Sequence, residues 1–270
     1  MRPTLALALM MAACGDDWHG VYANGEPFAE CAPPPARPAC SGSGRSFALA
    51  VCGDLEANNT LNVNGGGAEA ALWVAGSAVT RAPLTVQGAL WSASFTATNT
   101  VDVDSQRAGV APPSCAPVPA VRSETRWDVR IVEPAEVMLQ GCSFAQPSLQ
   151  VDNTLDVYVR GDVSWHIDGD VRIAAPLRVV LEPGARLDWT ITGALDVDNT
   201  LTVEGDSTML VGGRIRVAAP FELDGSLIAP GSRVEVDNTL TITGAAYVGA
   251  LRVAAPMRVG GETLLHEDGC

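Results

Sequence analysis

The chain has 270 residues, of which 47% are hydrophobic and 18% charged, and its 17 basic and 31 acidic residues give a formal net charge of −14. All of the basic residues are arginines. An acidic surface repels polyanions, so the composition argues against a nucleic-acid partner. No apolar run reaches the roughly 18 to 20 residues of a transmembrane helix, so any membrane attachment has to be covalent.

The N-terminus predicts such an attachment. Arg2 precedes an apolar stretch at residues 5–11, and Ala12 and Ala13 stand directly before Cys14. This pattern resembles the lipobox of bacterial lipoproteins, with Met11 in place of the usual leucine. The resemblance implies that residues 1–13 are a signal peptide, that Cys14 is acylated, and that the protein is anchored in the lipid bilayer of the cell envelope, at the outer membrane or the cell surface. The alternative is an ordinary secretory signal with Cys14 in a disulfide.

Six further cysteines support export. An even number of cysteines remains once Cys14 carries lipid, and this number suits three disulfides in an oxidising compartment. They are Cys31, Cys40, Cys52, Cys115, Cys142 and Cys270. We expect Cys31 to pair with Cys40 or Cys52, and Cys115 to pair with Cys142, although the sequence leaves the pairing open. Their spacing is not that of a zinc site, and we expect no metal and no cofactor.

Beyond the signal peptide the chain divides into three parts. Residues 14–46 are rich in Pro, Gly and Cys and predict a tether. Residues 47–263 repeat one short pattern about every 20 residues, interrupted by a Pro-rich insertion at about 105–125, and such a period predicts a solenoid. Residues 264–270 form a C-terminal tail.

The repeated pattern consists of two short apolar alternations separated by a three-residue insert. Five inserts carry asparagine in the middle: Asn59, Asn99, Asn153, Asn199 and Asn238. The other five end in proline, and their middle residues are Ala82, Glu133, Ala175, Ala219 and Ala255. The two kinds alternate along the chain, which predicts a repeating unit of two coils and about 40 residues.

The alternation predicts strands, because side chains two residues apart share one face of a strand. Proline cannot donate a ladder hydrogen bond, so we expect each insert to be a corner. The predicted fold is an all-β parallel β-helix of about ten coils. Outward residues of successive coils would stack as a charge ladder that fixes register. Its charged members are Arg130, Arg172, Asp196, Arg216, Glu235 and Arg252.

The pattern over roughly residues 47–261 is similar to Val- and Gly-rich bacterial β-solenoids such as the bactofilins. The corner asparagines resemble the asparagine ladder of pectate-lyase-like helices, although alanine takes every second position here. Bactofilins are cytoplasmic, whereas this chain begins with an export signal. An antiparallel β-sandwich is the competing architecture.

The sequence carries no familiar catalytic motif. His166 is the one candidate base outside the terminal segments, and Asp162, Asp168 and Asp170 form the nearest acidic cluster. We therefore predict a non-enzymatic, lipid-anchored, structural or adhesive rod whose acidic surface meets polysaccharide, cell wall or envelope protein. One alternative is a β-helix that binds polysaccharide or cleaves it as a lyase. A further alternative is a self-assembling scaffold, because head-to-tail stacking of the last copy on the first would continue the alternation.

Overall fold

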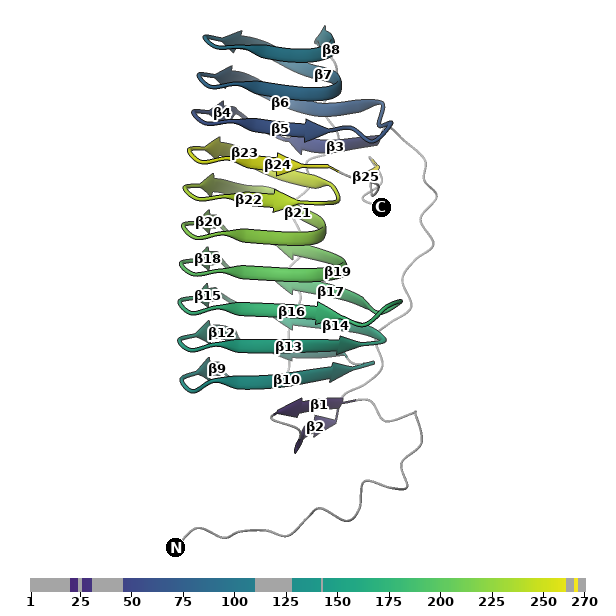
Figure 1. Ribbon diagram of the computed structural model, residues 1–270, viewed down its shortest axis with the longest axis vertical. Helices are drawn as coiled ribbons and strands as arrows, with labels where there is room; N and C mark the ends of the chain where they lie inside the picture. The colour runs from purple at the N-terminus through teal and green to yellow at the C-terminus, as the bar shows by residue number, and fades with distance from the viewer. Residues whose placement is uncertain are drawn as a thin grey trace, which may run out of the picture.

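The computed structural model describes residues 20–23, 26–30, 46–109, 128–141, 143–260 and 265–266. These residues form strands and turns but no helix, so none of them belongs to a helix that could span a membrane. The strands stack as a β-solenoid of about ten turns (Figure 1), which confirms the predicted all-β solenoid. Strands of neighbouring coils pair in parallel, for example β13 with β16 and β14 with β17, so the antiparallel sandwich is wrong.

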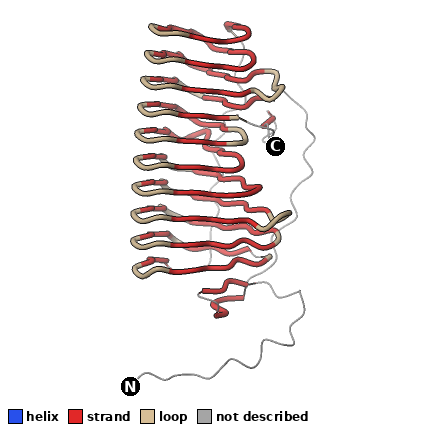
Figure 2. The backbone as a smooth tube through the Cα atoms, in the orientation of Figure 1, coloured by secondary structure: helices blue, strands red, loops and turns tan. Residues whose placement is uncertain are grey.

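Each coil contributes to three parallel sheets (Figure 2). The first sheet precedes the corner and contains β4 (Leu55–Ala57), β9 (Asp128–Ile131), β12 (Ser148–Val151), β15 (Val171–Ile173), β18 (Leu195–Val197) and β20 (Ile215–Val217). The second sheet follows the corner and contains β5 (Leu61–Asn64), β10 (Ala135–Gln140), β13 (Leu155–Arg160), β16 (Leu177–Leu181), β22 (Leu240–Ile242) and β24 (Met257–Val259).

The third sheet contains β3 (Ser46–Val51), β11 (Ser143–Gln146), β14 (Asp162–Ile167) and β17 (Arg186–Ile191). Longer strands bend from one sheet into the next and so contribute to two or three sheets. They are β6 (Ala70–Thr80), β7 (Leu84–Ala97), β8 (Val101–Ala108), β19 (Leu201–Val211), β21 (Phe221–Val236) and β23 (Ala246–Val253).

The coils do not stack in chain order. The last coil lies directly against the first, because β23 pairs with β3 and β4, and β24 pairs with β5. We call this junction the seam. It joins a first arm, residues 46–109, to a second arm, residues 128–260, in one continuous rod (Figure 1). Consequently β8 and β9, successive strands in the chain, lie at opposite ends of the stack, and β8 extends to Ala108, into the range predicted as an insertion.

The seam corrects one premise of the head-to-tail hypothesis. That hypothesis takes the outer edge of the last copy to be free, yet this edge is paired with the first copy of the same chain, Leu251 opposite Leu55 and Met257 opposite Leu61. The physical reason is that closing a long loop costs little more than closing a short one. An intramolecular partner with the matching kind of corner therefore competes effectively with a second molecule.

Both ends of the rod carry features that hinder an exposed strand edge from pairing with another chain. At one end, β8 turns Asp102 and Asp104 outward and places Gln106 opposite the buried Leu90. At the other end, β1 (Gly20–Ala23) pairs antiparallel with β10 and with β2 (Glu26–Glu30). The segment predicted as a tether thus contains two strands, because the outer edge of β10 offers unpaired backbone groups. Similarly, β25 (Leu265–His266) of the predicted tail pairs antiparallel with β3.

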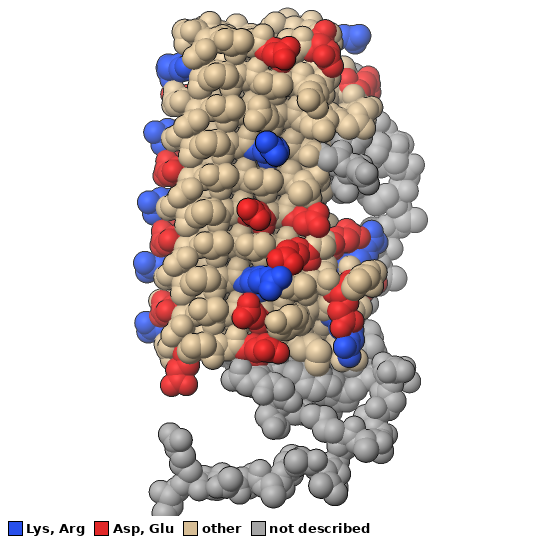
Figure 3. Space-filling model, in the orientation of Figure 1, with Lys and Arg blue, Asp and Glu red and all other residues tan. Residues whose placement is uncertain are grey.

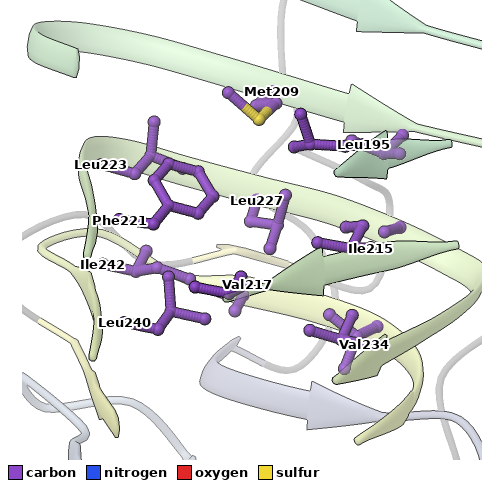
Figure 4. Close-up of a cluster of buried hydrophobic side chains, with 14 of the residues drawn as sticks. Leu195, Met209, Ile215, Val217, Phe221, Leu223, Leu227, Val234, Leu240 and Ile242 are labelled. Atoms are coloured by element: carbon purple, nitrogen blue, oxygen red, sulfur yellow. The ribbon is translucent and has the colours of Figure 1, made fainter. Parts of the chain in front are cut away.

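Aliphatic side chains fill the interior in layers. Figure 4 shows one region, in which Ile215, Val217, Phe221 and Leu240 point toward one another from adjacent coils. Each of these side chains is fully buried. A stack of aromatic rings extends the core beneath the third sheet: the ring centroids of Trp165 and Trp189 lie 4.7 Å apart with an interplanar angle of 4°. Successive coils therefore place like side chains in register.

Several predicted features fall outside the described residues. They include the signal peptide, the acylation site Cys14, and the cysteines Cys31, Cys40, Cys115, Cys142 and Cys270. Cys52 is described, directly after β3, and it is disulfide-bonded. The pairing of the six cysteines stays a prediction.

Candidate functional site

The two kinds of corner differ in how they deal with the backbone N–H of the last residue of the insert. In each asparagine corner the side-chain Oδ1 accepts a hydrogen bond from the N–H of the following threonine, as Asn199 does from Thr200 at 2.8 Å. In each alternate corner that position is proline, which has no N–H. The bonded threonines are Thr60, Thr100, Thr154, Thr200 and Thr239. Both kinds of corner therefore leave no unpaired donor at this position.

Each corner asparagine also reaches the neighbouring coil. Asn199 Nδ2 donates to the Ala174 carbonyl at 3.4 Å, and Asn238 Nδ2 donates to the Ala218 carbonyl at 3.3 Å. Asn59, Asn99 and Asn153 make the equivalent bond. The acceptor always belongs to a coil of the other kind. The asparagines thus hold the stack together and are engaged in backbone contacts.

Ion pairs run along the same edge of the rod, where Figure 3 shows red and blue side chains alternating. The predicted ladder residues do stack in register, with Arg172, Asp196, Arg216 and Glu235 opposite one another in turn. The arginines of this ladder, however, form ion pairs with aspartates of the corners and not with the acidic residues opposite them. Arg216 approaches Asp198 at 3.4 Å and Asp237 at 3.8 Å, both in asparagine corners. The six residues of the predicted ladder do not include these corner aspartates.

Two further arginines of the predicted ladder also lie near aspartates of asparagine corners. Arg130 pairs with the corner residue Asp152 at 2.6 Å, and Arg252 approaches Asp237 at 3.7 Å. Hydrogen bonds from Gln150 and then Arg130 hold the pKa of Asp152 below its ordinary value. The acids of the predicted column pair instead with arginines outside it, Asp196 with Arg214 and Glu235 with Arg233.

The candidate catalytic residues are spread over different structural roles. His166 is half-buried on β14, and desolvation lowers its pKa. Asp170 accepts a hydrogen bond from the Ala194 N–H, and Asp168 accepts one from Thr192. Within the described part of the chain, no group of three or more His, Cys, Asp or Glu side chains is placed to hold a metal ion.

A polar groove lies on the second sheet across the seam. It has a volume of about 300 Å³, and we call it the amide groove. It is lined by Asn62, Val63, Asn64, Thr85, Gln87, Arg258 and Gly260. Arg258 on β24 lies opposite Asn62 on β5, which lies opposite Thr85 on β7. Sequence reasoning missed this groove, since Arg258 is nearly 200 residues from Asn62 in the chain.

Apart from Arg258, the outward positions of the second sheet at the groove carry no charged side chain. The outward position opposite Thr85 is Asp102, and the one beyond Arg258 is Thr241, followed by Glu222. Figure 3 shows charged side chains gathered on the lower part of this face and at its top. Amide, hydroxyl and guanidinium groups thus line the groove, with Asp102 on one side and Glu222 beyond Thr241 on the other.

Arg258 differs from the other arginines that the structure describes. Ten of them form ion pairs, and Arg107 lies over the Trp91 ring at 5.8 Å. Among the described residues, Arg258 has no ion-pair, hydrogen-bond or ring partner. Its guanidinium is therefore available to a ligand.

Comparison of the chain with models of protein families, with curated proteins and with solved structures gives no match. The chemistry of the described surface is therefore the basis for a functional proposal.

Proposed function

We propose that this protein is a non-enzymatic, lipid-anchored rod of the cell envelope that presents its long faces to polysaccharide, cell wall or protein partners. The observation that carries this proposal is that the charged and amide side chains at the corners are regularly bonded to neighbouring coils. The corner asparagines bond to backbone, and the corner aspartates bond to arginines of neighbouring coils. Side chains used in this way hold a scaffold in shape and are not free for proton transfer.

The repeated coils also support the proposal of a rod with long faces. We infer that the structural unit is a pair of coils, one with an asparagine corner and one with an alanine-proline corner. Ten coils at the spacing of about 4.8 Å between strands give a rod of about 48 Å. Solenoids use such extended faces for binding. Anchoring at one terminus would hold this rod close to the membrane.

The anchoring is tested in a bacterial host that expresses the full chain or the Cys14→Ser variant. We expect the wild-type chain to incorporate labelled palmitate and to sediment with membranes, because acyl chains bind the bilayer in proportion to their buried methylene groups. The variant should carry no label and should appear in the soluble exported fraction. Equal membrane association of both proteins would contradict the lipid anchor.

The surface role is tested with purified residues 15–270. We expect the folded protein to co-sediment with insoluble envelope polysaccharide and to release no soluble sugar on prolonged incubation. The control is the same protein unfolded in urea and diluted immediately before mixing. Steady release of sugar fragments would overturn the non-enzymatic proposal and favour the lyase alternative.

A further inference from the structure

We propose that the amide groove binds a glycan that carries a carboxylate, with Arg258 as the residue that pairs with this carboxylate. This inference rests on the proposed contact with polysaccharide and assigns it to one site. The groove volume of about 300 Å³ lies at the lower end of the range of small-ligand sites.

The first step of the argument is the charge of Arg258. A guanidinium binds a carboxylate through two parallel hydrogen bonds, and ten described arginines already do so, or approach a carboxylate, within the protein. Arg258 stands in the same alternating pattern, but its neighbours across the sheet are Thr241 and Asn62. The protein thus supplies the cation and leaves the anion to a ligand.

The second step is the chemistry of the other lining residues. Asn62, Thr85 and Gln87 have no side-chain hydrogen bond to any described residue. Asn64 uses its Oδ1 to accept the Gly66 N–H at 3.1 Å, which leaves its Nδ2 free to donate. An amide both donates and accepts hydrogen bonds, and so does a hydroxyl. A row of such groups on a flat sheet suits the hydroxyls of a sugar chain.

The third step is the charge around the groove. Asp102 borders it on one side, and Glu222 lies beyond Thr241 on the other. A polymer with a carboxylate on every sugar would bring like charges against these residues. A glycan in which an acidic sugar alternates with neutral sugars avoids this repulsion. The groove therefore selects for isolated carboxylates.

The fourth step is the position of the groove on the seam. Asn62, Asn64, Thr85 and Gln87 belong to the first arm, whereas Arg258 and Gly260 belong to the second. A bound glycan contacts both arms, and a ligand that binds only the folded state stabilises it. Binding should therefore slow amide hydrogen exchange in β5 and β24 at the seam.

The test uses a tetrasaccharide in which glucuronate alternates with N-acetylglucosamine, and the same tetrasaccharide with its carboxyl groups reduced to alcohols. Binding to the purified full-length exported chain is measured by calorimetry. We expect the wild-type protein to bind the acidic probe at least about tenfold more tightly than the reduced one, as the loss of a charge-assisted hydrogen bond predicts.

Two variants separate the groove from the general charge of the face. Arg258→Gln should lose about tenfold or more in affinity for the acidic probe. Arg178→Gln is the matched control, because Arg178 occupies the equivalent outward position of the same sheet but is paired with Glu204. Its affinity should stay within about twofold of wild type, because it lies outside the groove.

Equal affinity of wild type and Arg258→Gln, equal losses in both variants, or no binding of the acidic probe would each overturn the proposal. Failure of the groove proposal can be told apart from failure of the proposed function. If Arg258→Gln still sediments with envelope polysaccharide like wild type, the groove is not the site but the rod remains a surface protein. If wild type fails to sediment at all, the contact with polysaccharide itself is contradicted.

Discussion

Asn59 Nδ2 donates a hydrogen bond of 3.2 Å to the carbonyl of Ala254, a residue 195 positions away in the chain. The same bond joins Asn199 to Ala174 and Asn238 to Ala218 within the second arm. The corner contact across the seam is therefore of the same kind as the corner contacts within an arm. The opposite charges of Arg252 and Glu56 also face each other across the seam. The two arms meet as if they were consecutive coils.

The equivalence of the two corners gives a first prediction. Asn199→Ala removes the acceptor for the Thr200 N–H and should lower the free energy of unfolding by about 1 kcal/mol. The double variant Asn199→Ala with Thr200→Pro should recover at least half of this loss, because proline has no N–H to leave unpaired. Urea unfolding measures both. A double variant that is less stable than the single one would contradict the equivalence.

A second prediction concerns Gly260 at the seam. Its φ of 113° disfavours any L side chain, and an added Cβ would overlap the Asn64 backbone oxygen. Gly260→Ala should therefore cost about 1 to 3 kcal/mol more than Gly184→Ala, because overpacking adds to the strain of the positive φ. Gly184 is the control, since its φ is 84° and an added Cβ meets no atom within 4 Å. Equal free energies of unfolding for the two variants would show that β24 and β5 can move apart at the seam without loss of stability.

The order of the coils leads to a third prediction. A circular permutant that begins at residue 128, continues through residue 260 into residue 46 by a linker of a few residues, and ends at residue 108 should fold. Its coils would then follow one another in chain order, and it should keep the β-strand signal of the wild type in far-ultraviolet circular dichroism. Faster refolding is also expected, because the mean sequence separation of contacts falls. A permutant that is unfolded at neutral pH would contradict the stacking of β24 on β5.

The stacked tryptophans give a fourth prediction. Trp165 and Trp189 are stacked nearly parallel and are buried, at 4% and 1% exposure. Trp165→Phe should lower the free energy of unfolding by about 1 to 2 kcal/mol in urea unfolding, because the smaller ring leaves part of the site unfilled. The comparison is Trp91→Phe, whose partner Trp73 lies edge-on at 76°. A free energy of unfolding that is unchanged in Trp165→Phe would contradict the close packing of the stacked pair.

A fifth prediction concerns acid. Hydrogen bonds from Arg160 and Arg178 hold the pKa values of Glu182 and Glu204 below their ordinary range in the folded protein. Carboxyls with a lowered folded pKa stabilise the fold above their unfolded pKa, and this stabilisation is lost as pH falls through the folded value. Unfolding temperature should therefore fall as pH is lowered below about 4.5, the ordinary region for glutamate.

The matched variants for this prediction are glutamine substitutions. Glu182→Gln with Glu204→Gln should make the fall in unfolding temperature less steep, because two of the titrating groups are gone. Glu222→Gln should leave the slope unchanged, since Glu222 has no ion-pair partner among the described residues. An identical acid profile for the double variant and wild type would show that the ion pairs contribute no stability.

The sequence by itself determined the local structure. Alternating apolar residues such as Leu195 and Val197 dictate strands with one buried face, and the proline or asparagine inserts dictate corners, because both features follow from backbone chemistry within a few residues. The stacking of Arg172 opposite Asp196 and Arg216 could also be predicted, since a parallel stack keeps equivalent positions together. The number of coils follows directly from the number of copies.

The tertiary structure alone decided which coils are neighbours. All five asparagine corners bond in the same way to a corner that contains proline, so alternation in the sequence does not specify that Asn59 meets Ala254. The same holds for the amide groove, whose residues come from both arms. The ion pairs of Asp198 and Asp237 likewise depend on how far an arginine side chain reaches across coils. These relationships are non-local contacts between interchangeable surfaces, and only the folded rod selects among them.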